Sequence, residues 1–226
     1  MRSISILVLA IAALLTGTQA WADNQATYKV TITNLTPGQT FTPQLLATHS
    51  RHVRLFNIGE QASLPLEILA EAGDTSPLTD YLLASPDQVS AAVTVPGLLG
   101  PGQSVSYEIT AARYHRFLSM AAMLIPTNDT FAAVDRLRLP RRGSTTTVAL
   151  AYDAGSEAND QNCLNIPGPR CGGAGHSPGP NKDDEGFVHV SNGFHDLPKA
   201  KEGEVLGPRV YDWRNPVARV VVKRIY

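Results

Sequence analysis

The chain has 226 residues and is nearly neutral, with 19 Lys and Arg against 20 Asp and Glu. This balance argues against nucleic acid as a partner, because nucleic-acid-binding domains present a basic face, and it gives no electrostatic reason to expect binding to an anionic membrane. The chain is long enough to bury a core as one β domain and is short for two domains.

The first 22 residues have the pattern of a cleavable signal peptide. Arg2 precedes an apolar run, and the sequence Ala-Trp-Ala at 20–22 fits the small-residue cleavage pattern. The run is shorter than the roughly 20 apolar residues of a membrane span, which favours cleavage after Ala22 over an uncut N-terminal anchor. We therefore expect a secreted protein, extracellular or periplasmic. Its mature chain, residues 23–226, would form a single domain without a transmembrane segment.

Strand patterns dominate the mature chain. Residues 28–34 alternate, with Val30 and Ile32 on one face. Residues 117–125 form a nearly continuous apolar run that ends at Pro126, which is typical of a strand buried on both faces. Further extended segments are expected at 53–56, 89–95, 104–110, 145–152, 187–190 and 218–225. Many short strands separated by turn residues predict an all-β sandwich or barrel.

Two short helices interrupt the strands. Residues 63–72 predict one helix that ends at Gly73, because glycine commonly follows the last helical residue. A second helical turn is expected around residues 78–83.

Residues 158–186 are rich in Gly, Pro, Asn and Asp and predict a long ordered loop. Cys163 and Cys171 lie within it. An oxidising compartment favours a disulfide between them that closes part of this loop. The alternative is a pair of metal thiolates, but no second Cys or His pair stands at zinc-site spacing.

Acidic residues cluster after two of the expected strands. Asp129 follows the strand at 117–125, and residues 153–160 follow the strand at 145–152. If these strands are neighbours, the two loops meet at one rim, where carboxylates need a cation between them. Ca²⁺ prefers six to eight oxygen ligands, and Gly155 allows a turn in which Asp153 and Glu157 face one ion. Ordinary turn chemistry is the competing interpretation.

Other candidate groups carry weaker signals. The run at 183–185 (Asp-Asp-Glu) could add ligands or form a solvated loop face. The histidines lack the H-x-x-x-H and H-E-x-x-H spacings of zinc or copper sites, and no G-x-S-x-G nucleophile motif is present. Asp129 and Asp153 could serve as the acid and base of a glycosidase, although nothing in the sequence prefers that role.

At the two acidic loops the sequence resembles the spondin domain, the module in the N-terminal half of F-spondin and mindin. Residues 126–130 (Pro-Thr-Asn-Asp-Thr) stand where the family has Pro-Ser-Pro-Asp-Trp, and residues 153–157 (Asp-Ala-Gly-Ser-Glu) stand where it has Asp-Ala-Gly-Thr-Asp. The sequence departs from the family by having Thr130 in place of Trp and Glu157 in place of Asp. Weaker matches, some of them to bacterial single-domain versions, lie at 48–50, 55–59, 70–74 and 212–219.

This resemblance implies an antiparallel β-sandwich similar to a C2 domain, with calcium bound in loops at one end. The calcium ligands of the family carry over to Asp129, Asp153 and Glu157. Glutamate still offers two oxygens at the third position, so calcium remains the expected cofactor.

The leading hypothesis is therefore a secreted, non-catalytic, calcium-binding domain that acts in adhesion or ligand recognition, with a surface protein or glycan as its partner. The alternatives are an exported hydrolase acting on a glycan or ester, which requires a deep cleft with converging polar groups, and a structural envelope protein that calcium only stabilises.

Overall fold

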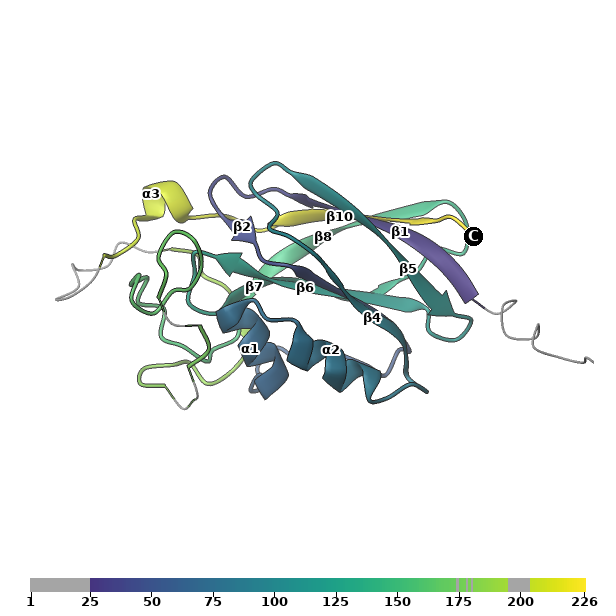
Figure 1. Cartoon of the computed structure of the whole chain (residues 1–226), viewed down its shortest axis with the longest axis horizontal. Coiled ribbons are helices and arrows are strands. Elements are labelled where there is room, and N and C mark those ends of the chain that lie inside the picture. The colour runs from purple at the N-terminus through teal and green to yellow at the C-terminus, as the bar shows by residue number, and fades with distance from the viewer. Residues whose placement is uncertain (1–24, 174, 178, 180, 195–203) are drawn as a thin grey trace, which may run out of the picture.

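Antiparallel strands make up most of the regular secondary structure in the computed structural model (Figure 1). The structure describes residues 25–173, 175–177, 179, 181–194 and 204–226, so the expected signal peptide, residues 1–22, lies outside the described residues. The strands are β1 (Gln25–Asn34), β2 (Thr40–Phe41), β3 (Gln44–His49), β4 (Val89–Val95), β5 (Ser104–Ala112), β6 (Phe117–Ile125), β7 (Thr130–Arg138), β8 (Ser144–Asp153), β9 (His189–Val190) and β10 (Ala218–Arg224). The helices are α1 (Leu64–Ala72), α2 (Ser76–Leu83) and α3 (Pro208–Tyr211).

The strands form one sheet that folds back on itself. Its order is β4-β3-β6-β7-β8-β10-β1-β5, with β2 added to β6 and β9 added to β8. The first half of β8 pairs with β10 and its last residues pair with β7, so β8 belongs to both halves of the fold. The sheet nearly closes where β5 meets β3 and β4, because Thr48 Oγ1 donates to the Thr110 carbonyl (2.6 Å) and the Ala112 N–H donates to Ser90 Oγ (2.9 Å). The predicted all-β class with a few short helices is confirmed.

The main core fills the space between the two halves of the sheet. Val30 and Ile32 of β1 are each 1% exposed and face this core, as their alternation predicted. From the other half, Leu118, Met120 and Leu124 of β6 join the same cluster, and all three are fully buried.

A second core lies on the outer face of β3, β6 and β7. Ala121 of β6 belongs to this cluster, although its neighbour Met120 belongs to the main core. Strand β6 is therefore buried on both faces, which confirms the interpretation of its apolar run. Helices α1 and α2 cover this outer face (Figure 1) and bury Leu66, Leu69, Leu78 and Leu82 there.

Both predicted helices are confirmed, and their ends follow local chemistry. Helix α1 begins after Ser63 with a proline in its first turn, where a missing N–H costs nothing. It ends at Gly73, whose φ of 68° is left-handed and whose N–H donates to the Leu69 carbonyl (3.0 Å).

The extended segment expected at Val53–Phe56 is not a strand. The second long strand is instead β3, in which every residue is buried, so it has no alternation of apolar and polar residues to reveal it. Phe56 acts as a core residue in a loop, with its ring 5.2 Å from that of Phe131 and 4.7 Å from that of Tyr152. Strand β7, also buried over its first half, was missed for the same reason.

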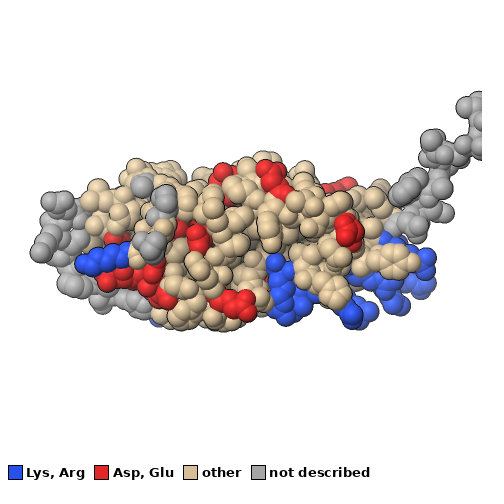
Figure 2. Space-filling view, turned by 90° about the horizontal axis from the view of Figure 1, so that it is seen from below, with Lys and Arg blue, Asp and Glu red and all other residues tan. Residues whose placement is uncertain are grey.

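The surface charges are separated along the molecule. Figure 2 shows Asp and Glu side chains over the left and middle of one face, while Lys and Arg side chains gather towards the right-hand end, where β1 begins and β10 ends. On this face, a nearly neutral chain therefore carries much of its basic surface at one end.

Candidate metal site

The two acidic loops meet at one end of the sheet. Asp129 comes immediately before β7, Asp153 is the last residue of β8, and Thr130 pairs with Asp153 in the register of these neighbouring strands. The Ala154 N–H also donates to the Asp129 carbonyl (3.2 Å). The predicted convergence of the loops is therefore present, but it is made by β7, a strand that the sequence did not reveal, rather than by direct pairing of β6 with β8.

Asp129 is fully buried and only half satisfied. Its Oδ2 accepts hydrogen bonds from the Ser156 N–H (2.8 Å), the Ser156 hydroxyl (3.3 Å) and the Glu157 N–H (3.0 Å). Its Oδ1 is buried and has no hydrogen-bond partner among the described residues. Burial, followed by the nearby charge of Asp153, raises the pKa of Asp129 well above its usual value.

Asp153 is 1% exposed and connects the site to two further groups. Its Oδ1 accepts from the Gly155 N–H (2.9 Å), and its Oδ2 accepts from Asn159 Nδ2 (3.0 Å). His189 Nε2 lies 3.5 Å from Asp153 Oδ1 and 4.0 Å from Glu185 Oε2. Asp153, Glu185 and His189 each offer a ligand atom, and these atoms lie within 4.8 Å of one another.

The orientation of His189 is set by its other ring nitrogen. Nδ1 is 3.0 Å from the Val190 carbonyl, which suits an Nδ1–H donor. Nε2 is then directed at two carboxylates and makes no hydrogen bond within the described part of the chain. A cation among these three side chains would contact Nε2 and both carboxylates at once.

Glu157 contributes to the site differently from the other two predicted ligands. Its main-chain N–H binds Asp129, but its Oε1 accepts from the Ser177 hydroxyl (2.6 Å), and its Oε2 is buried with no hydrogen-bond partner in the described residues. Burial raises the pKa of Glu157 to about 7, with a further contribution from the charge of Glu71. The structure thus brings Asp129 and Asp153 together and places the Glu157 carboxyl beside a neighbouring group.

That neighbouring group centres on Glu71 of α1, which is 1% exposed. Its Oε2 accepts from the Ser177 N–H (2.7 Å) and lies 2.8 Å from His176 Nδ1. Ser177 therefore links Glu71 to Glu157. No local sequence pattern indicates this contact, because Glu71 and Ser177 are 106 residues apart in the chain.

Gly155 confirms the turn that was expected between Asp153 and Glu157. Its φ is 65°, a left-handed conformation that glycine adopts without strain. A Cβ at this position would also lie 2.7 Å from the Phe187 nitrogen. The residue therefore allows both the tight turn and the close approach of the segment that carries Glu185 and His189.

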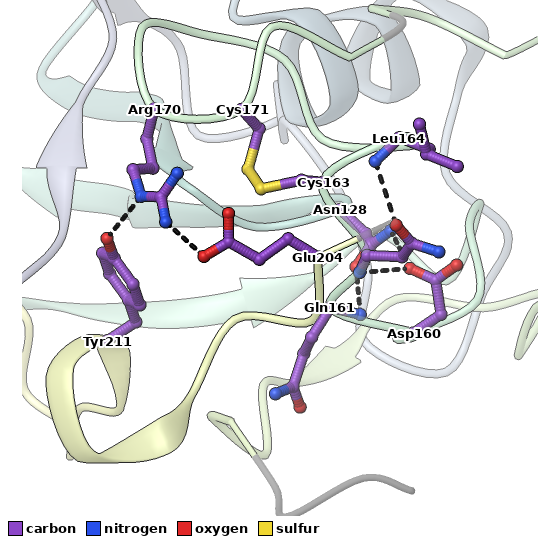
Figure 3. Close-up of a disulfide and its surroundings, with 10 residues drawn as sticks. Asn128, Asp160, Gln161, Cys163, Leu164, Arg170, Cys171, Glu204 and Tyr211 are labelled. Carbon is purple, nitrogen blue, oxygen red and sulfur yellow. Dashed lines mark hydrogen bonds and ion pairs between the residues drawn. A yellow bond between two sulfur atoms is a disulfide. The ribbon is translucent and has the colours of Figure 1, made fainter. Parts of the chain in front are cut away.

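The predicted disulfide is present between Cys163 and Cys171 (Figure 3). It closes a small ring within the long loop, which contains no strand or helix in its described part. Arg170, inside the ring, binds Tyr211 (3.1 Å) and forms an ion pair with Glu204. These contacts fix the ring to the segment that leads into α3.

Asn128 joins the disulfide loop to the acidic turn. Its Nδ2 donates to Asp160 Oδ1 (3.1 Å), and its Oδ1 accepts from the Gln161 N–H (3.2 Å), as Figure 3 shows. Because Asn128 directly precedes Asp129, its hydrogen bonds connect the loop that carries the disulfide to the candidate metal site.

A comparison with family models identifies the chain. The Spondin_N family model matches residues 15–160, which include Asp129, Asp153 and Glu157 and end before the disulfide, Glu185 and His189. A search of curated proteins found no match. No helix in the described residues is long and apolar enough to span a membrane. The match covers more than half of the sequence, and the chain therefore belongs to the Spondin_N family of non-enzymatic, extracellular domains.

Proposed function

We propose that this protein is a secreted, calcium-binding domain that recognises a surface protein or glycan without catalysing a reaction. The observation that carries the proposal is the unpartnered Oδ1 of Asp129, a fully buried carboxylate oxygen beside the buried carboxylate of Asp153. Leaving a buried charged oxygen without a partner is costly, whereas a cation would satisfy it.

The donor atoms around Asp129 suit a hard cation. Asp129 and Asp153 would hold the ion, and Glu157 would join them if its carboxyl exchanged Ser177 for the ion. Asn159 already binds both Asp153 and Glu185 through its Nδ2 (3.0 Å each), so its side chain lies at the same rim. Carboxylate and amide oxygens are the ligands that Ca²⁺ prefers. When bound, the ion would offset both the burial and the repulsion from Asp153 that raise the pKa of Asp129.

A bound ion would also order the surface proposed for recognition. The loops after β6 and β8 and the segment carrying Glu185 come from distant parts of the chain, and cross-linking them would fix the shape of the rim. A hydrolase site at the acidic rim is less favoured. The pocket beside Glu157 has a volume of about 200 Å³, below the roughly 300–1,000 Å³ of typical substrate pockets.

Isothermal titration of the metal-free protein with Ca²⁺ tests the proposal. We expect saturable heat with the unaltered protein, none with Asp153→Asn, and unchanged heat with Asp80→Asn, an exposed residue of α2 that provides a charge-matched control. Parallel titrations with Zn²⁺ and Mn²⁺ test whether the His189 nitrogen selects a different ion. Absence of Ca²⁺ heat in the unaltered protein would remove calcium from the proposal.

Recognition is tested separately with a glycan array and a panel of surface proteins, each probed with and without Ca²⁺. Binding that requires Ca²⁺ and is lost in Asp153→Asn supports recognition at this rim. A protein that gains thermal stability from Ca²⁺ but binds no partner on either panel would favour the purely structural alternative.

A further inference from the structure

A groove lies at the end of the sheet opposite to the acidic loops. It has a volume of about 630 Å³, within the range of typical ligand pockets. Its walls come from the start of β1, the turn between β5 and β6, the turn between β7 and β8, and the end of β10. Strand β8 runs from this end to Asp153, and ten residues at about 3.4 Å each separate the two ends by roughly 30 Å.

Five arginines line the groove: Arg113, Arg116, Arg141, Arg142 and Arg224. They come from the β5–β6 turn, the β7–β8 turn and the end of β10, and Figure 2 shows Lys and Arg side chains gathered towards the end of the molecule where β10 ends. In the described part of the chain, arginine ion pairs with acidic side chains involve Arg54, Arg136, Arg170 and Arg214, so none of the five groove arginines is neutralised in this way.

Two of the groove arginines are held in position by main-chain oxygens. Arg116 Nε donates to the Arg113 carbonyl (2.9 Å), and Arg224 Nη1 donates to the Arg141 carbonyl (2.8 Å). Arg224 Nε also donates to the Tyr226 main-chain oxygen (3.0 Å). These bonds therefore use one nitrogen of Arg116 and two of Arg224 and leave the remaining guanidinium nitrogens available. An immobilised guanidinium loses less entropy on binding an anion, and its planar fork matches sulfate, phosphate and carboxylate groups.

We propose that this groove binds a segment of an anionic polysaccharide through the sulfate, phosphate or carboxylate groups on its sugar units. The site is concave, which suits a chain ligand better than the plane of a lipid bilayer. Two tyrosines that are each 80% exposed, Tyr114 and Tyr226, lie close in sequence to groove arginines. Exposed aromatic rings of this kind pack against the apolar faces of sugar rings while their hydroxyls stay in water. Arginines and aromatic rings together fit a charged glycan better than a free inorganic anion.

The groove binds independently of the calcium site. The two regions share no residue, and no group at the groove needs a cation for its position. Failure of the calcium proposal would therefore leave polysaccharide binding intact, and the reverse also holds.

Binding of heparin-derived and polygalacturonate oligosaccharides, measured by titration in the presence of a chelator, tests the inference. We expect binding that weakens with added salt, because it depends on contacts between arginines and sulfate or carboxylate groups. The sulfated and carboxylated probes show which acidic group is preferred. Neutral dextran serves as the negative control, and inorganic sulfate alone should bind far more weakly than the sulfated oligosaccharide.

The decisive variant is Arg141→Gln with Arg142→Gln. Both residues are exposed in a turn, and neither side chain makes a hydrogen bond within the described part of the chain, so the fold should be preserved. Loss of two charge-assisted contacts should weaken oligosaccharide binding by about tenfold or more. Arg209→Gln with Arg219→Gln makes the same charge change at exposed positions outside the groove and should leave the affinity within about twofold.

Three outcomes would overturn the inference. No binding to either acidic oligosaccharide at low ionic strength would exclude the ligand class. Equal losses in the two double variants would show non-specific attraction to net charge rather than a site. Binding to vesicles containing phosphatidylglycerol, together with no oligosaccharide binding, would identify the basic end as a membrane contact instead.

Discussion

Asp129 and Asp153 lie side by side at adjoining ends of β7 and β8, where Thr130 pairs directly with Asp153. Both carboxylates are almost completely removed from solvent. After burial itself, the charge of Asp153 is the largest cause that raises the pKa of Asp129. Without a cation, the folded protein therefore binds a proton at Asp129 more tightly than the unfolded chain does, which makes stability depend on pH.

The first prediction concerns pH in the presence of a chelator. The pKa of Glu157 rises from 4.5 to about 7 on folding, so the folded state holds the extra proton between these values. The stabilisation that protonated Glu157 contributes to the folded state is fully present below pH 4.5 and is lost as the pH rises through about 7. Glu157→Gln should reduce the change in the free energy of unfolding across this pH range by about 1–2 kcal/mol, after allowance for solvent screening. Urea unfolding at a series of pH values measures the difference.

Comparing the variant with the unaltered protein isolates Glu157 from other titrating groups. The pKa of His49 is lowered by burial, so this residue destabilises the fold as the pH falls below 6.5, which is the opposite sign. Because His49 is present in both proteins, its contribution cancels. Identical pH slopes for the two proteins would contradict the raised pKa of Glu157.

The second prediction concerns calcium and stability. If Ca²⁺ binds the folded state alone, a concentration one hundred times the dissociation constant should stabilise the protein by about 2.7 kcal/mol. Asp129→Asn should abolish this gain, whereas Asp80→Asn should retain it. Thermal unfolding with and without a chelator measures the effect. An equal calcium-dependent gain in Asp129→Asn would place the ion elsewhere.

The third prediction concerns the turn at Gly155. Gly155→Ala adds the strain of a left-handed backbone and a collision with the main chain of Phe187. We expect a loss of about 2–4 kcal/mol in the free energy of unfolding. Gly143 has nearly the same φ, 66°, but open space around it, so Gly143→Ala should cost only about 1 kcal/mol. Denaturant titration of both variants separates the collision from the backbone strain.

The fourth prediction concerns the disulfide. Cys163→Ser with Cys171→Ser opens a ring with a sequence separation of 8, for which chain entropy predicts a loss of about 2–3 kcal/mol. Because Asn128 connects this loop to the acidic turn, calcium affinity should fall as well. A variant that unfolds more easily yet binds calcium as tightly as the unaltered protein would show that the ring supports only the loop.

The sequence predicted those elements whose patterns are local. Strand β1 alternates because one face is solvated, and α1 ends at a glycine whose conformation requires that residue. Strand β3 and the first half of β7 are buried on both faces, so they show no alternation. Their strand character comes from neighbours that are distant in the chain, and a single sequence carries little sign of such pairing.

The same distinction separates the site residues that were found from those that were missed. Asp129 and Asp153 were predicted because each lies in an acidic loop with a recognisable motif. His189 reaches the site only because β9 pairs with β8, which puts it opposite Asp153 in the register. The acidic run that contains Glu185 was noted as a possible source of ligands, but only the position of this segment against Gly155 decides which of its carboxylates reaches the site.

Strand β8 couples the unfolding of the two halves of the fold, because it is paired with strands of both. Its first residues are bonded to β10 and its last to β7 and β9. Backbone amides in the middle of β8 can therefore exchange with solvent only when both halves of the sheet open, that is, by global unfolding. Amides in the disulfide loop have few strand neighbours and should exchange through small local openings. Native-state hydrogen-exchange rates should thus rise from the centre of β8 towards the loop. Local opening of the loops at the rim should leave the sheet intact.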